Sequence, residues 1–235
     1  MNAARISAII VKEYHDLKAN VQVLMMLLIP IFLAVLYSRM GDDGKEFSFV
    51  FVSLFSLTFV TMYVQSMLIS EEKEKNTLQA LLMSPANTVE IMVGKSTMTV
   101  IITIISLVIS WFIMDIELNN LGILLLVFIL SVVLFLCIGT IVGLISKNLI
   151  QTGVYIMPFM FLFGLAPMIQ LYFSESWIGD ILSYSPSVFT MDISMSALEG
   201  SAFSSYQTDL LWLAGWMIVG LIGTFMLLKK NSLSN

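Results

Sequence analysis

The stretch that decides the fold is Phe47–Ile69, FSFVFVSLFSLTFVTMYVQSMLI. It contains no charged residue, and it exceeds the roughly 20 residues that an α-helix needs to cross the hydrocarbon core of a bilayer. Inside lipid every backbone N–H and C=O group must find a partner within the protein, so only helices and closed barrels can span it. The sequence has no series of strand-length segments with alternating polarity. We therefore expect this stretch to be a transmembrane helix.

Five further apolar runs surround this helix in the sequence. The composition indicates the same class, because 58% of the residues are hydrophobic, 11% are charged and the mean hydropathy is +0.95. Ordinary soluble domains are far more polar. We predict an all-α integral membrane protein with one transmembrane domain over residues 1–235 and six transmembrane helices. The predicted spans are residues 21–37, 47–69, 96–114, 121–145, 153–171 and 210–228.

The charged and metal-binding residues exclude several functions. With 16 acidic and 11 basic residues the net charge is −5, which argues against nucleic acid as a partner, because phosphate binding needs a basic surface. A single cysteine, Cys137, and a single histidine, His15, exclude an intrachain disulfide and a cysteine/histidine metal site. The spans contain no paired carboxylates and no activated nucleophile, so we expect no catalytic residue and no metal on this chain.

The positions of lysine and arginine predict the orientation in the membrane. Short loops rich in these residues stay on the cytoplasmic side. In a six-helix arrangement Arg39 and Lys45 fall on one side and the other nine fall on the opposite side. Those nine are Arg5, Lys12, Lys18, Lys73, Lys75, Lys95, Lys147, Lys229 and Lys230. The sequence therefore predicts a multi-pass protein of the plasma membrane with both termini in the cytoplasm.

An amphipathic segment precedes the first span. In residues 3–19 apolar side chains recur at helical spacing, and charged side chains occupy much of the remaining surface. The apolar members are Ile6, Ile9, Ile10, Tyr14 and Leu17. This pattern predicts a helix within residues 1–19 that lies in the membrane interface. The pattern is equally compatible with a simple anchor and with a helix that relays motion to the first span.

The long connection between the second and third spans is residues 71–95, EEKEKNTLQALLMSPANTVEIMVGK. Asn76 and Gln79 form a capping signature for a short helix, which Ser84-Pro85 ends. The apolar face of that helix is Leu78, Leu81 and Leu82. Such a helix is either a spacer that rests on the membrane or a knob that fits the groove of a partner protein.

Residues 71–95 resemble the first cytoplasmic loop of ABC-2-type permeases. The pattern of that loop is acidic-basic-acidic, then Gly-Thr-Leu, two leucines and Ser/Thr-Pro. This sequence departs from it at Lys73, where arginine is usual, and at Asn76, where glycine is usual. Lysine keeps the charge, and asparagine is the next residue best suited to a left-handed turn. The resemblance extends over the whole chain, including an N-terminal interfacial helix, six spans and an outer re-entrant segment.

The resemblance implies a role for the loop, because in that family its short helix is the coupling helix that docks into a cleft of an ATPase subunit. The residues assigned to ATPase coupling in this way are Glu72, Glu74, Asn76, Thr77, Leu78, Leu81, Leu82, Ser84 and Pro85. The resemblance also implies two ATPase subunits, which bind ATP and Mg²⁺, and a second permease that is either a copy of this chain or a homologue. We expect no cofactor on this chain itself. Gly94-Lys95-Ser96 matches the end of a P-loop, but Val89 occupies the position of the required glycine.

The outer connection over residues 172–208 is too long for a tight turn and too apolar for a disordered segment. We predict two short, half-buried helices separated by Ser185-Pro186-Ser187. By resemblance, this segment is a re-entrant hairpin that closes the outer mouth, with Trp177, Pro186 and Phe189 as gate residues. The alternative is an interfacial cap with no gating role.

Candidate residues for a translocation path lie in the second and fifth spans. Thr58, Thr61 and Gln65 share one face of the second span, although hydrogen bonds between helices explain them more simply than substrate recognition. The fifth span contains Pro158, Phe161 and Pro167, and its prolines predict a kink. No charged residue lies in the middle of a span, which argues against an ion-gradient carrier.

These observations together favour the permease subunit of an ATP-driven exporter. The chain itself carries no ATPase motif, so we do not expect it to be an enzyme. A weakly polar path lined by methionine and phenylalanine suits an amphipathic or lipid-like cargo better than a small ion. Small permeases of this kind, without large outer domains, resemble those that export amphipathic or membrane-active peptides, bacteriocins or antibiotics from Gram-positive bacteria, and this resemblance implies cargo of that class. Lipid or glycan export remains open. A third hypothesis is a non-transporting membrane immunity or sensor protein that binds a toxin or a histidine kinase through its outer segment. We also expect membrane lipid as a partner of the chain.

Overall fold

The computed structural model describes residues 3–39, 44–75 and 88–233. In these ranges the chain is helical and has no β-strand, which confirms the predicted all-α class. The elements in chain order are α1 (Ala3–Ala19), α2 (Val21–Tyr37), α3 (Lys45–Phe55), the π-helical η1 (Ser56–Met62), α4 (Tyr63–Glu74), α6 (Thr88–Met114), α7 (Leu121–Ile145), α8 (Leu149–Tyr172), α9 (Trp177–Leu182), α10 (Pro186–Leu198), the 3₁₀ turn η2 (Phe203–Ser205) and α11 (Gln207–Leu233).

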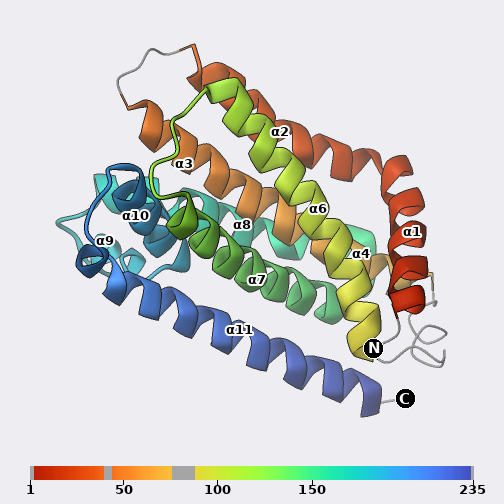
Figure 1. Ribbon diagram of the computed structural model, residues 1–235. Coiled ribbons are helices and arrows are strands. Elements are labelled where there is room, and N and C mark those ends of the chain that lie inside the picture. The colour runs from red at the N-terminus through yellow and green to blue at the C-terminus, as the bar shows by residue number, and fades with distance from the viewer. Residues whose placement is uncertain (1–2, 40–43, 76–87, 234–235) are drawn as a thin grey trace.

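The helices form one elongated bundle, and both ends of the chain lie at the same end of it (Figure 1). Five helices are long and apolar enough to cross a membrane: Lys45–Glu74, Glu90–Met114, Leu121–Ile145, Leu149–Tyr172 and Gln207–Lys230. Residues Arg5–Leu17 of α1 and Val21–Tyr37 of α2 meet the same criteria of length and composition only as a pair, which is bent by 83°, so the spans number five, or six if the bent pair counts as one. The 17 residues of α2 are at the lower limit of the 17 to 25 residues that usually span a bilayer.

The centre of the bundle is the continuous helix made of α3, η1 and α4. Its apolar window is 89% buried within the chain, far more than that of the other spans. Helix α7 approaches it closely, because a Cβ atom on Gly139 would lie 2.6 Å from the carbonyl oxygen of Met62 and one on Gly143 would lie 2.7 Å from that of Ser66. Small residues let two membrane helices approach in this way. The Gly139/Gly143 pair therefore packs inside the protomer.

Several helices extend beyond the spans predicted from hydropathy. The span expected at 96–114 begins at Thr88, the one at 153–171 covers 149–172, the one at 47–69 covers 45–74, and the one at 210–228 covers 207–233. Hydropathy detects only the apolar part of a helix, whereas the backbone hydrogen bonds continue into the headgroup region through polar residues. Helix α7 covers 121–145, which is the predicted range.

Residues 172–208, the predicted outer connection, contain the two helices α9 and α10, which lie at the opposite end of the bundle from the chain termini (Figure 1). Pro186 occupies the first turn of α10, where a missing N–H costs nothing. Most residues of α10 are buried, and the helix contacts α3, α7, α8 and α11. Asn119 and Asn120 donate side-chain hydrogen bonds to the carbonyl oxygens of Leu198 and Ala197 at its end. Helix α10 is thus part of the bundle and not a loose cap.

Candidate functional site at the ends of α4 and α6

The predicted coupling helix, from Asn76 to Pro85, lies outside the described residues. The structure does describe the helices on both sides of it, since α4 ends at Glu74 and α6 begins at Thr88. The coupling roles of Asn76, Thr77, Leu78, Leu81, Leu82, Ser84 and Pro85 stay predictions. Two of the predicted coupling residues, Glu72 and Glu74, are described, and both make contacts within the protomer.

A cluster of charged side chains holds α4 and α6 together. We call Lys12, Glu13 and Asp16 of α1, Glu72 of α4 and Lys95 of α6 the ionic cluster. The Lys95 side chain is completely buried, and its Nζ lies 2.6 Å from Glu13 Oε1 and 3.0 Å from Glu72 Oε1. It also donates a hydrogen bond to the carbonyl oxygen of Leu68. Lys95 therefore bridges α6 to both α1 and α4.

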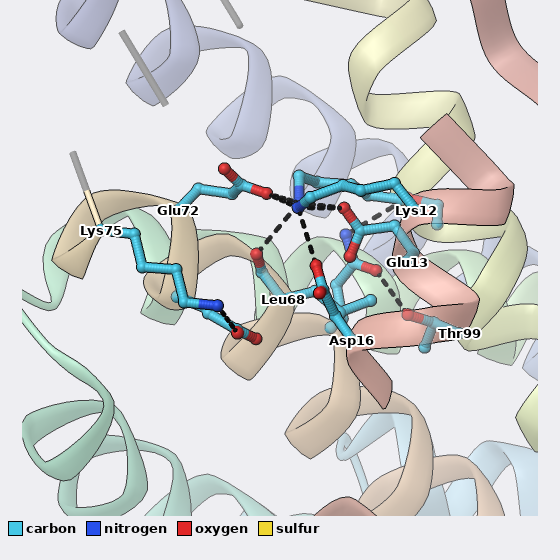
Figure 2. Close-up of polar contacts among 11 residues, drawn as sticks. Lys12, Glu13, Asp16, Leu68, Glu72, Lys75 and Thr99 are labelled. Carbon is cyan, nitrogen blue, oxygen red and sulfur yellow. Dashed lines mark hydrogen bonds and ion pairs between the residues drawn. The ribbon is translucent and has the colours of Figure 1, made fainter. Parts of the chain in front are cut away.

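The exposed side of the ionic cluster is formed by Lys12. Its Nζ forms an ion pair with Glu72 and lies 3.1 Å from both Glu13 Oε1 and Asp16 Oδ2. Figure 2 shows the carboxylates of Glu13 and Asp16 on α1 and of Glu72 on α4 directed toward the side-chain nitrogen of Lys12. The Lys12 side chain is 44% exposed, whereas those of Glu13 and Glu72 are 1% and 2% exposed. The cluster thus runs from the surface into the protein.

Because the ionic cluster is largely buried, the loss of one of its charges should reduce the stability of the protein strongly. Two charges removed from water pay a large desolvation cost, and removal of one partner of a buried pair usually costs about 3 to 5 kcal/mol because the other charge stays buried. The cluster contains two lysines and three carboxylates, and Glu13 Oε2 has no hydrogen-bond partner among the described residues. Each lysine is therefore needed to compensate more than one carboxylate.

The other side of the α4 end is bound to the turn between α7 and α8. Lys73 Nζ donates to the carbonyl oxygens of Leu144 and Ser146, at 2.5 and 2.6 Å, and a cation at the C-terminus of a helix is favoured by the helix dipole. Glu74 Oε2 accepts a hydrogen bond of 2.8 Å from the backbone N–H of Leu149, at the N-terminus of α8, where negative charge is favoured. The acidic-basic-acidic run thus connects α4 to four other helices, α1, α6, α7 and α8.

A row of polar side chains continues from the ionic cluster along the contact between α4, η1 and α6. Gln65 accepts a hydrogen bond from Thr99 and donates to Ser96 and Thr140. Thr61 and Thr103 are hydrogen bonded at 2.8 Å. Because these groups are buried, each bond also avoids an unsatisfied polar group in a lipid-like environment. The row fixes the register of α6 against the central helix.

The predicted path residues therefore occupy different environments. Thr58, Thr61 and Gln65 are fully buried inside the protomer, and Thr58 donates a hydrogen bond to the carbonyl oxygen of Leu54 in its own helix. On α8, Pro158 and Phe161 are exposed, whereas Pro167 is buried. The structure thus separates these six residues into an internal set and an exposed set, and their role in translocation stays a prediction.

The predicted gate residues are likewise divided. Phe189 on α10 is buried and stacks on Trp212 of α11, with ring centroids 6.3 Å apart and ring planes at 4°. Pro186 is buried at the start of the same helix, but Trp177 on α9 is 71% exposed. Thr190 adds a hydrogen bond of 2.8 Å to Ser131 on α7. Phe189 and Pro186 thus help to hold α10 in the bundle, and gating by these residues stays a prediction.

The ionic cluster was not predicted from the sequence. One signal for it exists, because Glu13 lies on the same stripe of α1 as the buried residues Ile9 and Leu17, at spacings of four residues. A charged residue in an apolar stripe requires a partner. The Gly94-Lys95-Ser96 match also has a packing explanation, because a Cβ on Gly94 would lie 2.7 Å from Ile9 Cγ2 of α1.

The profile of a family described as ABC-2 family transporter protein matches residues 42–226. The match covers most of the chain, and the chain belongs to this family. It is therefore a multi-pass membrane protein and the membrane-spanning permease component of an ABC transporter, which associates with ATPase subunits. A comparison with curated proteins gave no match.

Proposed function

We propose that this permease works in an ATP-driven exporter with two ATPase subunits docked at residues 76–85 and with a second permease, either a copy of the chain or a homologue. The observation that carries the proposal is the position of that segment between α4 and α6, two helices joined by the buried Lys95–Glu72 pair. A segment with both flanks fixed in this way can transmit displacement into the bundle. ATP and Mg²⁺ belong to the partner subunits.

The contacts of the α4 end define a route for the motion. Closure of the ATPase subunits around ATP would displace the segment that carries Leu78, Leu81 and Leu82. The hydrogen bonds of Lys73 and Glu74 would carry this displacement to α7 and α8. Because packed helices move as rigid bodies, the result is a rearrangement between protomers and not a local deformation.

The exposed face of α8 is the part of the structure best suited to line the path. Met157, Phe159, Phe161 and Leu162 are each at least 40% exposed in the protomer, and Pro158 lies among them. The internal set of Thr58, Thr61 and Gln65 is already hydrogen bonded or packed, so we assign the path to α8. The outer segment, with Trp177, Pro186 and Phe189, is the proposed gate.

The same surface supports a class of cargo. Methionine and phenylalanine side chains adapt to apolar molecules of varied shape, and the described spans place their charged groups near the helix ends. Amphipathic or membrane-active peptides, bacteriocins and antibiotics fit this surface best, and lipid or glycan cargo is the nearest alternative. We propose export across the plasma membrane of a bacterium, with both termini in the cytoplasm, as the distribution of lysine and arginine indicates.

Co-purification tests the proposal directly. The wild-type chain and a Leu78/Leu81/Leu82→Ser variant are extracted from the producing cells in mild detergent, and each preparation is probed for a bound ATPase. A matched control carries Trp177, Ile181 and Phe203→Ser, which alters three side chains of the outer end that are 71%, 62% and 54% exposed. We expect the ATPase to be lost from the first variant alone. If no ATPase accompanies the wild type, the immunity or sensor hypothesis takes its place.

A further inference from the structure

Helix α1 is attached to the bundle in two distinct ways. Along its buried stripe, Ile9 contacts α6 at Gly94, and Leu17 packs in an apolar cluster with Leu68 and Met98. Beside this apolar contact, Glu13 and Lys12 extend to the two helices that flank the predicted coupling segment. An anchor on the membrane surface would need only the apolar stripe and an outward-facing basic side.

The charged attachment has a specific geometry. Lys95 on α6 is shared between Glu13 on α1 and Glu72 on α4, and Glu72 is in turn shared between Lys95 and Lys12. The four groups therefore close a ring of contacts through three helices. Buried ion pairs contribute little net stability, because the desolvation cost offsets the attraction, but a charge displaced from such a ring is left unpaired. The ring thus opposes relative motion of the three helices.

We infer that Lys12 and Glu13 are positioning residues that make α1 move together with the ends of α4 and α6 during the ATP cycle. This inference rests on the proposed function and adds a role for the N-terminal helix, which becomes a moving part of the transmission and not a passive anchor. Glu13 contacts Lys95 and Lys12 contacts Glu72, so the two residues of α1 would act through these side chains.

The arrangement allows a selective test. The double variant Lys12→Gln/Glu13→Gln removes one positive and one negative charge from α1, so the net charge is unchanged and the Lys95–Glu72 pair remains. A matched control is Glu71→Gln/Lys75→Gln, which removes the neighbouring ion pair of 2.6 Å on α4, where the Lys75 side chain is 56% exposed. The conservative variant Lys12→Arg/Glu13→Asp retains both charges and serves as the rescue.

Hydrogen exchange provides the measurement. Complexes with the ATPase are compared without nucleotide and after trapping with Mg²⁺, ATP and orthovanadate. Exchange is followed at the backbone amides of residues 6–17 and 68–75, because hydrogen exchange detects local opening of a helix. In the wild type we expect trapping to change exchange in both regions. In the double glutamine variant the change at 68–75 remains and the change at 6–17 is lost, whereas the control and the conservative variant behave like the wild type.

The outcomes separate the two proposals. If trapping changes exchange at 68–75 but not at 6–17 in the wild type, or changes 6–17 equally in the double glutamine variant, the inference about α1 is wrong and the proposed function stands. If the wild-type chain carries no ATPase, or trapping changes neither region, the proposed function fails and the inference fails with it. Whether trapping changes exchange at residues 6–17 is first decided in the wild-type complex, so the inference about α1 can be contradicted even if the double glutamine variant does not fold.

Discussion

The two ends of the bundle are held together by different kinds of contact. At the cytoplasmic end proposed here, a few buried charges on α1, α4 and α6 share partners, with Lys95 at the centre. At the other end α10 is held by apolar packing, by the Phe189–Trp212 stack and by hydrogen bonds such as that between Thr190 and Ser131. Shared buried charges are lost together, whereas dispersed apolar contacts are lost one at a time. Under the proposed function, the end with the shared buried charges transmits motion and the other end closes the path.

Lys95→Met should have the largest effect on stability. It removes the fully buried lysine between Glu13 and Glu72 and leaves these two buried carboxylates with Lys12, whose side chain is 44% exposed, so we expect a loss of about 3 to 5 kcal/mol in the free energy of unfolding. The matched variant Lys75→Met breaks an exposed ion pair with Glu71 and should cost about 0 to 1 kcal/mol. Denaturant unfolding in detergent, followed by tryptophan fluorescence, measures both. Equal effects would show that the ionic cluster does not hold the cytoplasmic end.

Gly139→Ala should have an intermediate effect. It tests the close contact between α7 and the central helix made of α3, η1 and α4. The added Cβ would lie 2.6 Å from the carbonyl oxygen of Met62, and overpacking of this kind usually costs about 1 to 3 kcal/mol. At Gly215 on α11 a Cβ would meet nothing within 4 Å, so Gly215→Ala should stabilise the helix by roughly 0.5 to 1 kcal/mol. The same unfolding assay compares the two variants, and a neutral Gly139→Ala would argue against the close approach of α7.

Thr190→Val should have a smaller effect and probes the outer end. It removes the hydrogen bond to Ser131 and the one that Thr190 donates to the carbonyl oxygen of Pro186 in its own helix, while it keeps the approximate shape of the side chain. Hydrogen bonds between membrane helices contribute about 0.6 kcal/mol on average, so we expect a loss of about 0.5 to 1.5 kcal/mol. A loss as large as that in Lys95→Met would contradict the contrast between the two ends.

Asp192 on α10 should give the smallest effect, visible as a pH dependence. Partial removal of water by the surrounding chain, and the nearby Asp209 carboxylate, raise the pKa of Asp192 to about 6, but the residue is exposed at the protein surface, so solvent reduces the accompanying change in stability. A carboxyl whose pKa is higher in the folded state stabilises that state fully below its unfolded pKa of about 4, and the contribution is lost as the pH rises through its folded pKa. The wild-type melting temperature should therefore fall between these pH values relative to that of Asp192→Asn. If the melting temperatures of the wild type and of Asp192→Asn change with pH in the same way, the raised pKa of Asp192 is wrong.

Much of the fold could be predicted from the sequence, because long uncharged runs in lipid have one helical solution. The all-α membrane class and the ABC-2 family were both predicted and are confirmed. The ionic cluster could not be predicted, because Glu13 and Lys95 are 82 positions apart and hydropathy identifies no partners. The full lengths of the helices could not be predicted from hydropathy for a related reason, since polar residues such as Glu90 are helical here although they lower the hydropathy.

The candidate site was predicted only in part. Glu72 and Glu74 were assigned to ATPase coupling by resemblance. The structure adds that Glu72 contacts both α1 and α6, that Lys73 contacts α7, and that Glu74 contacts α8. Helical geometry places consecutive residues about 100° apart around the axis, so three successive side chains necessarily reach different neighbours. That consequence could be foreseen only once the neighbours were known.

Site-specific photo-crosslinking from the two ends of the bundle tests the central claim most directly. Benzoylphenylalanine is placed at Leu81 in the coupling segment or at Trp177, which is 71% exposed at the outer end, and crosslinks are formed in the producing cells. The account predicts an adduct with an ATPase subunit from position 81 and none with that subunit from position 177. No ATPase adduct from position 81, together with capture of a different protein from position 177, would contradict it and favour the immunity or sensor hypothesis.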